Sequence, residues 1–260
     1  MLTLDGTLEP DSHALLQSEF DHALAEVPTA VVCSADAVTH ADQSVPGWFV
    51  AMARQAAEWP GIPSLLACAG SHAVATQMRQ VAGNGPTVFP TVVQALEDVT
   101  SRRPRVEARF PLPPRPEVVK HARDIVETAC LEWDAIEYAW SATLVASELI
   151  TNAILHTATP AELICSYEPG RFRLSVRDAL DQPPTRLEPT SETEHGRGLL
   201  LVHQLTHSWG TLPTSDGGKL IWCLLAPDGD PSPASSPPGP RSRCVEGTPW
   251  VEGIDRHGRV

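Results

Sequence analysis

Apolar and polar positions follow two different patterns over the first 100 residues. Three continuous apolar runs are typical of buried strands: 29–36, 63–70 and 87–90. Three segments between and after them carry apolar residues at helical spacing: 47–61, 71–83 and 91–99. The first of these helices is expected to stop at Pro60-Gly61 and the second to close on Gly83. Strands that alternate with helices predict an α/β layer domain over residues 1–100.

A second domain is predicted over residues 105–226, with its helices first and its strands later. Helical spacing covers 116–133 and 136–156, and a glycine turn at 195–210 leads into another helix. Three runs are strand candidates: 161–168, 171–178 and 219–226. Helices on one side and antiparallel strands on the other predict a two-layer α/β sandwich. The fold class is therefore α/β throughout.

Two further segments lack a regular pattern. Residues 101–117 contain five Pro and five Arg, which predicts an extended linker at 101–115. The tail, 227–260, is dense in Pro, Ser and Gly and is expected to be disordered. The tail also contains a short apolar stretch, "TPWVEGI", so the alternative is that part of the tail docks in a groove.

Charge and cysteine content exclude several classes of protein. The formal charge is −13, and residues 1–100 carry 11 acidic side chains against Arg54 and Arg79 alone. No basic footprint for nucleic acid is present, so the acidic part is either a protein-binding surface or a solvated face. The six cysteines form no C-x-x-C pair, which favours reduced core cysteines. With no signal peptide and no run of about 20 apolar residues, we expect a cytoplasmic protein without a membrane anchor.

The stretch "SELITNAILH" places three polar side chains in a line within an apolar helix. Glu148, Asn152 and His156 are each four residues apart, so they share one face of the helix. This stripe is either a solvated face or part of a binding site. His156 is as well explained by a solvent-facing position as by a ligand contact.

Two later motifs favour a binding site. Asp178 ends a predicted strand and is followed by a turn-rich loop. Gly196 and Gly198 flank Arg197 and open a helix, where free backbone N–H groups and the helix dipole favour phosphate. The order of the three motifs along the chain is more specific than any one of them.

Together, "ELITNAILH", "VRDALDQPP" and "HGRGLLLVHQLTHSWGTLPTSDGGKLIW" resemble the ATP-binding domain of the histidine-kinase, gyrase and Hsp90 superfamily. More narrowly they resemble the anti-sigma-factor serine kinases common in actinomycetes. The resemblance implies that Glu148 is the general base, Asn152 the Mg²⁺ ligand and Asp178 the acceptor for the adenine amino group. It also implies that Gly196, Arg197 and Gly198 close over the phosphates.

The sequence departs from that family at two places. Ala179 and Leu180 stand in the first glycine box, where many superfamily members carry glycine. Leu220 stands in the closing strand where relatives usually have Thr, which implies weaker support for the adenine contact.

The N-terminal segments 4–24, 30–48, 61–83 and 88–99 resemble the STAS domain of anti-anti-sigma factors. The family's phosphorylated serine lies in an Asp-Ser-Ser-Gly motif, and the equivalent stretch here is Asp42-Gln43-Ser44-Val45-Pro46. Ser44 is therefore either a phospho-acceptor or a capping or loop serine in a domain that has lost the switch.

These resemblances imply a regulator of a partner-switching pathway that uses ATP and Mg²⁺, with serine-protein kinase activity on a STAS partner. The alternative is an ATP-holding switch or scaffold with little turnover, whose STAS-like domain masks the ATP-binding domain. The implied partners are an anti-anti-sigma protein or a sigma factor, while an intramolecular contact and a homodimer both remain open. Opposite charges on the acidic domain and on the Arg-rich segment favour contact between the domains near the nucleotide site, within one chain or swapped across a dimer, and the alternative is two independent domains.

Overall fold

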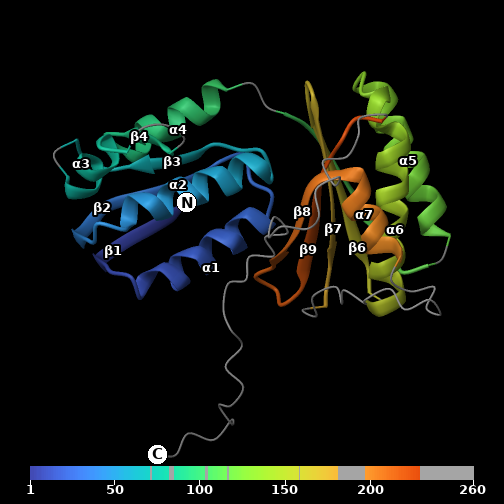
Figure 1. Cartoon of the computed structure of the whole chain (residues 1–260), viewed down its shortest axis with the longest axis horizontal. Coiled ribbons are helices and arrows are strands. Elements are labelled where there is room, and N and C mark those ends of the chain that lie inside the picture. Colours follow the sequence, from blue (N-terminus) through green and yellow to red (C-terminus); the bar gives the residue numbers. More distant parts are fainter. Residues whose placement is uncertain are drawn as a thin grey trace, which may run out of the picture.

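A computed structural model describes residues 1–70, 72–81, 85–102, 105–115, 117–157, 159–180 and 197–228, without the side chains of 155–157 and 197–200. Within these ranges the chain forms two sheets, each with its own helices (Figure 1). The predicted α/β class is confirmed, with a parallel sheet in the first domain and an antiparallel sheet in the second. The predicted tail, apart from Pro227 and Asp228, lies outside the described residues.

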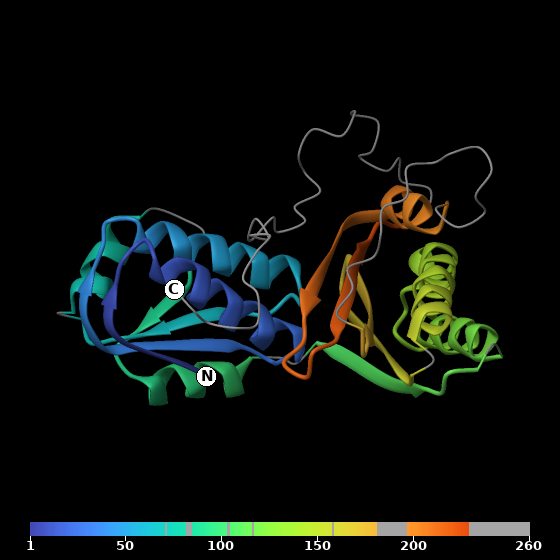
Figure 2. The same ribbon diagram turned by 90° about the horizontal axis from the view of Figure 1, so that it is seen from below.

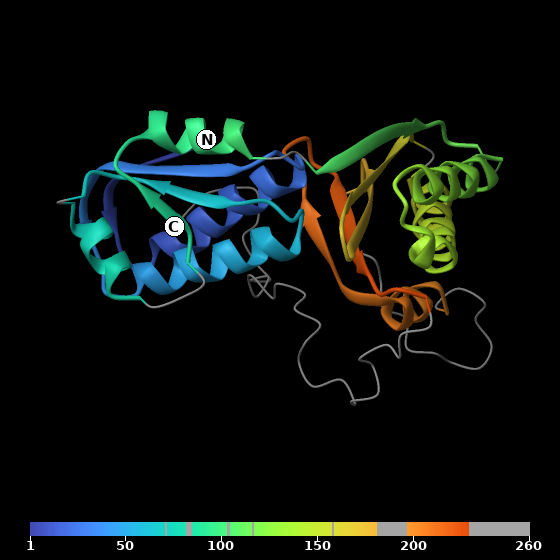
Figure 3. The same cartoon turned by 90° about the horizontal axis from the view of Figure 1, so that it is seen from above.

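The N-terminal domain is a four-stranded parallel sheet in the order β1-β2-β3-β4. Its strands are β1 (Leu2–Leu8), β2 (Val31–Ala41), β3 (Ser64–Ala67) and β4 (Thr87–Phe89). Its helices are α1 (Ser12–Ala25), α2 (Val45–Glu58), α3 (Ala73–Arg79) and α4 (Val92–Ser101). Helices α1, α2 and α3 cover one face, and α4 covers the other (Figure 3).

Both faces of this sheet are apolar, which explains the continuous runs in the sequence. Cys33 and Leu66 belong to the cluster that includes α1 and α2, whereas Val32 and Leu65 belong to the cluster with Ala95 of α4. Because successive side chains of a strand point to opposite faces, a strand covered on both sides needs apolar residues at every position.

The C-terminal domain is a five-stranded antiparallel sheet in the order β5-β6-β7-β9-β8. Its strands are β5 (Val106–Leu112), β6 (Ala161–Glu168), β7 (Arg171–Asp178), β8 (Thr206–Pro213) and β9 (Lys219–Leu225). Its helices are α5 (Val118–Glu132), the short η1 (Ile136–Tyr138), α6 (Ala139–Thr157) and α7 (Arg197–Leu205). The helices cover one face of the sheet (Figure 2), as the two-layer prediction requires.

Two strands correct the expectations from sequence. Residues 106–112, inside the predicted linker 101–115, form β5. Apolar residues at every second position explain this strand, although the Pro and Arg between them hide the pattern. The helix predicted within 195–210 ends at Leu205, and Thr206 begins β8, which pairs with β9 along its length.

The N-terminal domain lies against the sheet face that the helices leave open (Figure 2). Helices α1 and α2 point their C-terminal ends at that face, where arginines bind the last carbonyl groups. Arg109 donates from Nη2 to the carbonyl oxygens of Glu26 (3.2 Å) and Val27 (3.0 Å) after α1. Since a helix C-terminus carries unsatisfied carbonyls and a partial negative charge, a guanidinium is a favourable partner there.

Arg173 makes the corresponding contact with α2. Its Nε donates to the carbonyl oxygen of Glu58 (3.1 Å) and its Nη2 to that of Ala57 (3.3 Å), while Nη1 lies 2.9 Å from Glu168 Oε1. The side chain has no solvent exposure. Burial lowers the pKa of the guanidinium, and the Glu168 carboxylate opposes this shift. Gly61 has a φ of +82°, and a Cβ there would lie 2.2 Å from Arg173 Cζ, so a side chain at this position would displace the arginine.

Apolar contacts join the two domains beside this arginine. The rings of Trp59 and Trp222 stack at a centroid distance of 5.7 Å and an interplanar angle of 11°. Leu220 and Ile164 of the antiparallel sheet belong to the same buried cluster as the core of the N-terminal domain. The outer face of the antiparallel sheet is thus an internal surface of the protein. Among the described residues, no helix is both long enough and apolar enough to cross a membrane.

The described cysteines are buried and free: Cys33, Cys68, Cys130, Cys165 and Cys223. Burial raises the pKa of the Cys33 and Cys130 thiols to about 12. Since the thiolate is the reactive form, these two residues act as small core residues rather than as nucleophiles.

We expect Arg173→Met to lower the free energy of unfolding by about 3 kcal/mol, because it leaves two partly buried carbonyl groups at the end of α2 and the Glu168 carboxylate without their cationic partner. Urea unfolding followed by circular dichroism measures the change. Arg171→Met is the matched control, since this arginine lies on the same strand with an exposed side chain. Equal stability of the two variants would contradict a structural role for the Arg173 contacts.

Asp21 gives the α1–α2 contact a pH dependence. Its Oδ1 accepts from Gln17 Nε2 (2.8 Å) and Gln55 Nε2 (2.7 Å), and its residue exposure is 8%. Burial raises the pKa of this carboxyl above its usual 3.8, and the hydrogen bonds from Gln55 and Gln17 oppose the shift. A raised pKa means that the fold favours the protonated form, so this stabilisation is present below pH 3.8 and is lost as the pH rises through the folded-state pKa.

Asp21→Asn keeps the acceptor for both glutamines and removes the buried charge. We therefore expect the variant to match the wild type near pH 4 and to become more stable than it as the pH approaches 7. Thermal unfolding across this pH range measures the difference, with Glu19→Gln on the exposed face of α1 as the control. A stability difference between Asp21→Asn and wild type that does not change with pH would show that Asp21 does not titrate in this range.

Candidate functional site

Helix α6 places the predicted polar stripe at the edge of the core. Val145, Leu149 and Ala153 are buried against the sheet, whereas Glu148 and Asn152 are half-buried. The two polar residues are four apart, so their side chains lie one above the other on the same face. The side chain of His156, the third member of the stripe, lies outside the described residues.

The start of α6 is held by the chain that leaves β9. The Asp228 carboxylate accepts hydrogen bonds from the backbone N–H groups of Trp140 and Ser141, both at 3.0 Å. This satisfies two of the four N–H groups that have no partner within the helix. The contact ties α6 to the end of the interior strand β9 and so sets the position of Glu148 and Asn152 relative to the sheet.

Asp178 ends strand β7 on the face that carries the helices. Leu174 and Val176 precede it at alternate positions and belong to the same core as α6. Asp178 is 5% exposed, and its Oδ1 accepts from the backbone N–H of Leu180 at 2.9 Å. Helices α6 and α7 pack over this face of the sheet, so Asp178 lies on the face covered by the helix that carries Glu148 and Asn152.

Lys219 lies directly opposite Asp178 and was not predicted as a site residue. The two are cross-strand partners at the ends of β7 and β9. Lys219 Nζ donates to Asp178 Oδ1 at 2.9 Å and to the carbonyl oxygen of Leu180 at 3.0 Å, and the lysine is 7% exposed. The buried carboxylate therefore has a buried cationic partner.

The turn between β8 and β9 fixes this pairing. Thr214 Oγ1 accepts from the Gly218 N–H at 2.9 Å, and the Thr214 N–H donates to the Gly218 carbonyl at 3.0 Å. Gly217 has a φ of +82°, which suits glycine in a tight turn. A Cβ on Gly218 would lie 2.2 Å from the Asp178 carbonyl oxygen, so only glycine allows this close approach of the two strands.

The predicted phosphate-binding residues are only partly within the described chain. Gly196 lies outside it, and Arg197 and Gly198 form the first residues of α7, with their side chains outside the description. The position of Arg197 and Gly198 at a helix N-terminus is the one that the sequence predicted.

Ser44 lies in the other domain, immediately before α2. Its side chain is exposed, and both its Oγ and its N–H donate to Asp42 Oδ1, at 2.6 and 2.8 Å. These hydrogen bonds hold the pKa of the Asp42 carboxyl below its usual value. Ser44 makes no side-chain capping bond to α2, so a capping role is not observed, and the phospho-acceptor and the loop serine both stay predictions.

The donor set fits a magnesium ion that is bound together with a nucleotide. A single amide oxygen, from Asn152, is available at the helix face, and Mg²⁺ commonly takes most of its other ligands from phosphate and water. Among the described residues, no three His, Cys, Asp or Glu side chains cluster as a metal site of their own. The Asn152 oxygen is thus suited to Mg²⁺ that is bound together with phosphate.

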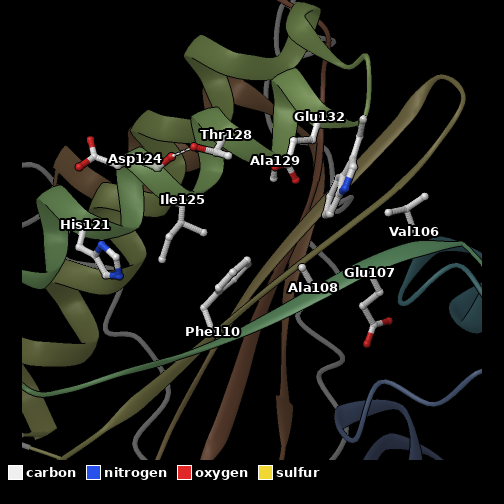
Figure 4. A pocket seen from close by; sticks show the side chains of 11 residues that line it. Val106, Glu107, Ala108, Phe110, His121, Asp124, Ile125, Thr128, Ala129 and Glu132 are labelled. Atoms are coloured by element: carbon white, nitrogen blue, oxygen red, sulfur yellow. Dashed lines mark hydrogen bonds between the residues drawn. The ribbon is translucent and has the colours of Figure 1, made fainter.

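A groove of about 410 Å³ opens between β5 and α5, away from these residues (Figure 4). Phe110, Ile125 and Trp133 line its apolar part, and Glu107 points away from it. None of Glu148, Asn152 and Asp178 lines this groove. Its lining includes the acidic residues Asp124 and Glu132, whose charge opposes phosphate binding, so we do not assign it to the candidate site.

Comparison with known protein families decides the class of the second domain. Residues 112–223 match the family model of the histidine kinase-like ATPase domain. The C-terminal domain is a histidine kinase-like ATPase domain. The match includes Glu148, Asn152, Asp178 and Lys219, and it covers less than half of the chain. A search of curated proteins finds no match to the chain.

Two groups of residues in this ATPase domain were missed from sequence. Lys219 could have been found, because an antiparallel pairing of "RLSVRD" with "KLIWCLL" brings the terminal Asp and Lys together. Arg173 carried no comparable signal, since its partners are backbone carbonyls of another domain, whereas Arg109 belongs to the Arg-rich segment that was expected to contact the N-terminal domain.

We expect Gly218→Ala to destabilise the protein by about 1–3 kcal/mol, because the added methyl group forces β9 away from the end of β7. Gly47→Ala is the matched control: Gly47 lies within α2 with open space around its Cα, so alanine there has the better helix propensity. Chemical unfolding of both variants measures the effect. A Gly218→Ala protein as stable as Gly47→Ala would show that the strand ends adapt without cost.

Proposed function

We propose that this protein is an ATP-binding regulator of a partner-switching pathway, with Mg²⁺-dependent serine-protein kinase activity on a STAS-domain partner. The observation that carries the proposal is that Glu148 and Asn152 share one face of α6 inside the ATPase domain, and that α6 packs on β7, the strand that ends in Asp178. The resemblance of the same motifs to anti-sigma-factor serine kinases supports the finer assignment, and a sigma factor would be the final target. Such a protein would act in the cytoplasm.

Each proposed role follows from the chemistry of the side chain. Glu148 is a carboxylate and accepts the proton of an attacking hydroxyl group. Asn152, one turn further, offers the amide oxygen that would hold Mg²⁺, which when bound neutralises phosphate charge. Asp178 accepts from the adenine amino group, and the start of α7 with Gly196, Arg197 and Gly198 would bind the phosphates.

The serine that receives the phosphate is proposed to belong to another molecule. Ser44 precedes the first turn of α2, while Arg173 binds the last carbonyls of that helix. A 14-residue helix is about 21 Å long, and the antiparallel sheet lies between its end and Glu148. Ser44 is therefore remote from the active site of its own chain, although its exposure leaves it accessible to a kinase in trans.

A second candidate is an ATP-holding switch or scaffold with little turnover. The extensive contact of the N-terminal domain with the ATPase sheet favours this second function. The N-terminal domain covers the outer face of the sheet and so keeps other proteins from binding that face. The contact lies on the side of the sheet away from Glu148, so the catalytic side stays available. Phosphotransfer separates the two functions.

We expect Glu148→Gln to bind Mg-ATP as the wild type does but to lose at least 100-fold in phosphotransfer to a STAS-domain protein, because the amide cannot accept the proton. Asn152→Ala should instead lose the Mg²⁺-dependent part of ATP binding. Calorimetry with and without Mg²⁺, together with transfer of labelled phosphate to a panel of STAS proteins, measures both.

Ser147→Ala is the control, since the neighbouring Ser147 hydroxyl donates back to the Thr143 carbonyl of its own helix. Full phosphotransfer by Glu148→Gln would remove Glu148 from the role of base. ATP binding by the wild type with no transfer to any STAS protein would favour the switch over the kinase.

A further inference from the structure

The buried Lys219–Asp178 pair stands at the position where the proposed function places the adenine base. Both residues are less than 10% exposed, and both lie on the helix-covered face of the sheet. Lys219 Nζ donates one hydrogen bond to Asp178 Oδ1 and one to the Leu180 carbonyl oxygen. An ammonium group has three donors, and a carboxylate can accept about four hydrogen bonds, so the pair retains one donor and further acceptor capacity.

We propose that Lys219 is a specificity-determining residue for the nucleotide base: it donates to N1 of adenine while Asp178 accepts from the 6-amino group. This assignment rests on the proposed function, because it takes the nucleotide site as given. It adds a direct contact between adenine N1 and Lys219, a residue to which the family resemblance assigns no role.

The pair matches the edge of adenine and opposes that of guanine or hypoxanthine. Adenine presents a donor at position 6 and an acceptor at N1, next to each other. A 6-oxopurine presents an acceptor at position 6 and a donor at N1, so each group would face a side chain of the wrong kind. A site that leaves buried polar groups unpaired in this way discriminates strongly between otherwise similar ligands.

The discrimination requires that the two side chains cannot exchange places. Asp178 is held by the Leu180 N–H and Lys219 by the Leu180 carbonyl, so one residue orients both. Gly218 lets the strand ends approach closely, and the turn bonds of Thr214 fix the register. Donor and acceptor therefore have defined positions before any nucleotide binds.

The test compares the affinities of the full-length protein for ATP, 1-deaza-ATP and ITP, measured by calorimetry with Mg²⁺. 1-Deaza-ATP lacks only the N1 acceptor, whereas ITP reverses both groups. We expect the wild type to bind 1-deaza-ATP about 10- to 100-fold more weakly than ATP, the loss typical of one hydrogen bond from a charged donor. ITP should bind more weakly still.

Lys219→Met should bind ATP and 1-deaza-ATP with affinities that agree within about threefold, and should narrow the gap between ATP and ITP. The ratio of affinities within one variant does not depend on the fraction of folded protein, so a stability loss does not obscure the result. Arg177→Gln is the matched control: it removes one positive charge from the same end of the sheet but on the outer face, where Arg177 contacts Glu26 and Asp216. It should keep the wild-type ratios.

Three results overturn the proposal. Equal binding of ATP and 1-deaza-ATP by the wild type would show that Lys219 does not reach N1, while ATP binding itself would leave the proposed function standing. Tighter ATP binding by Lys219→Met would show that the lysine competes with the base for Asp178. Absence of binding of all three nucleotides would refute both the base contact and the proposed function.

Discussion

The binding of helix C-termini by sheet arginines is the constraint on which the arrangement of the two domains depends. Helices α1 and α2 end against the outer face of the antiparallel sheet, and their last carbonyl groups need donors once water is excluded. Arg109 and Arg173 supply those donors, and the stacked rings of Trp59 and Trp222 exclude water beside them. Because the two arginines belong to β5 and β7, the N-terminal domain docks on the sheet in one defined position.

This docking position explains why the interior strands of the antiparallel sheet have buried residues on both faces. In β9 every residue is buried, because alternate side chains enter the helix-covered core and the domain interface. The same two strands carry both functions: β7 presents Arg173 outward and ends in Asp178 on the inner face, and β9 presents Trp222 outward and begins with Lys219 on the inner face. Docking of the N-terminal domain and preparation of the proposed nucleotide site therefore use the same backbone.

The division of the sheet into two faces also separates the roles of its partners. The outer face is occupied by the chain's own N-terminal domain, so other proteins that bind the ATPase domain need other surfaces. The inner face, with Glu148 and Asn152 on α6, has no contact with that domain among the described residues. Contact between the domains was expected near the nucleotide site, and the structure places it across the sheet from that site instead. The reason is electrostatic and local, since the charges that attract are arginines on the outward positions of β5 and β7.

Local patterns in the sequence determined the two-domain α/β plan, the helix with its line of Glu148 and Asn152, and the strand that ends in Asp178. Each of these follows from a period of 3.6 or 2 residues and from the chemistry of nearby side chains, which a single segment carries by itself. Sequence could not establish β5, hidden in an Arg- and Pro-rich stretch, because its strand character depends on pairing with β6. Tertiary structure alone decided that Lys219 neutralises Asp178 and that Arg173 binds the end of α2. These contacts join residues 41 and more than 100 positions apart, and they exist only where the register of the sheet and the docking of the domains bring the groups together.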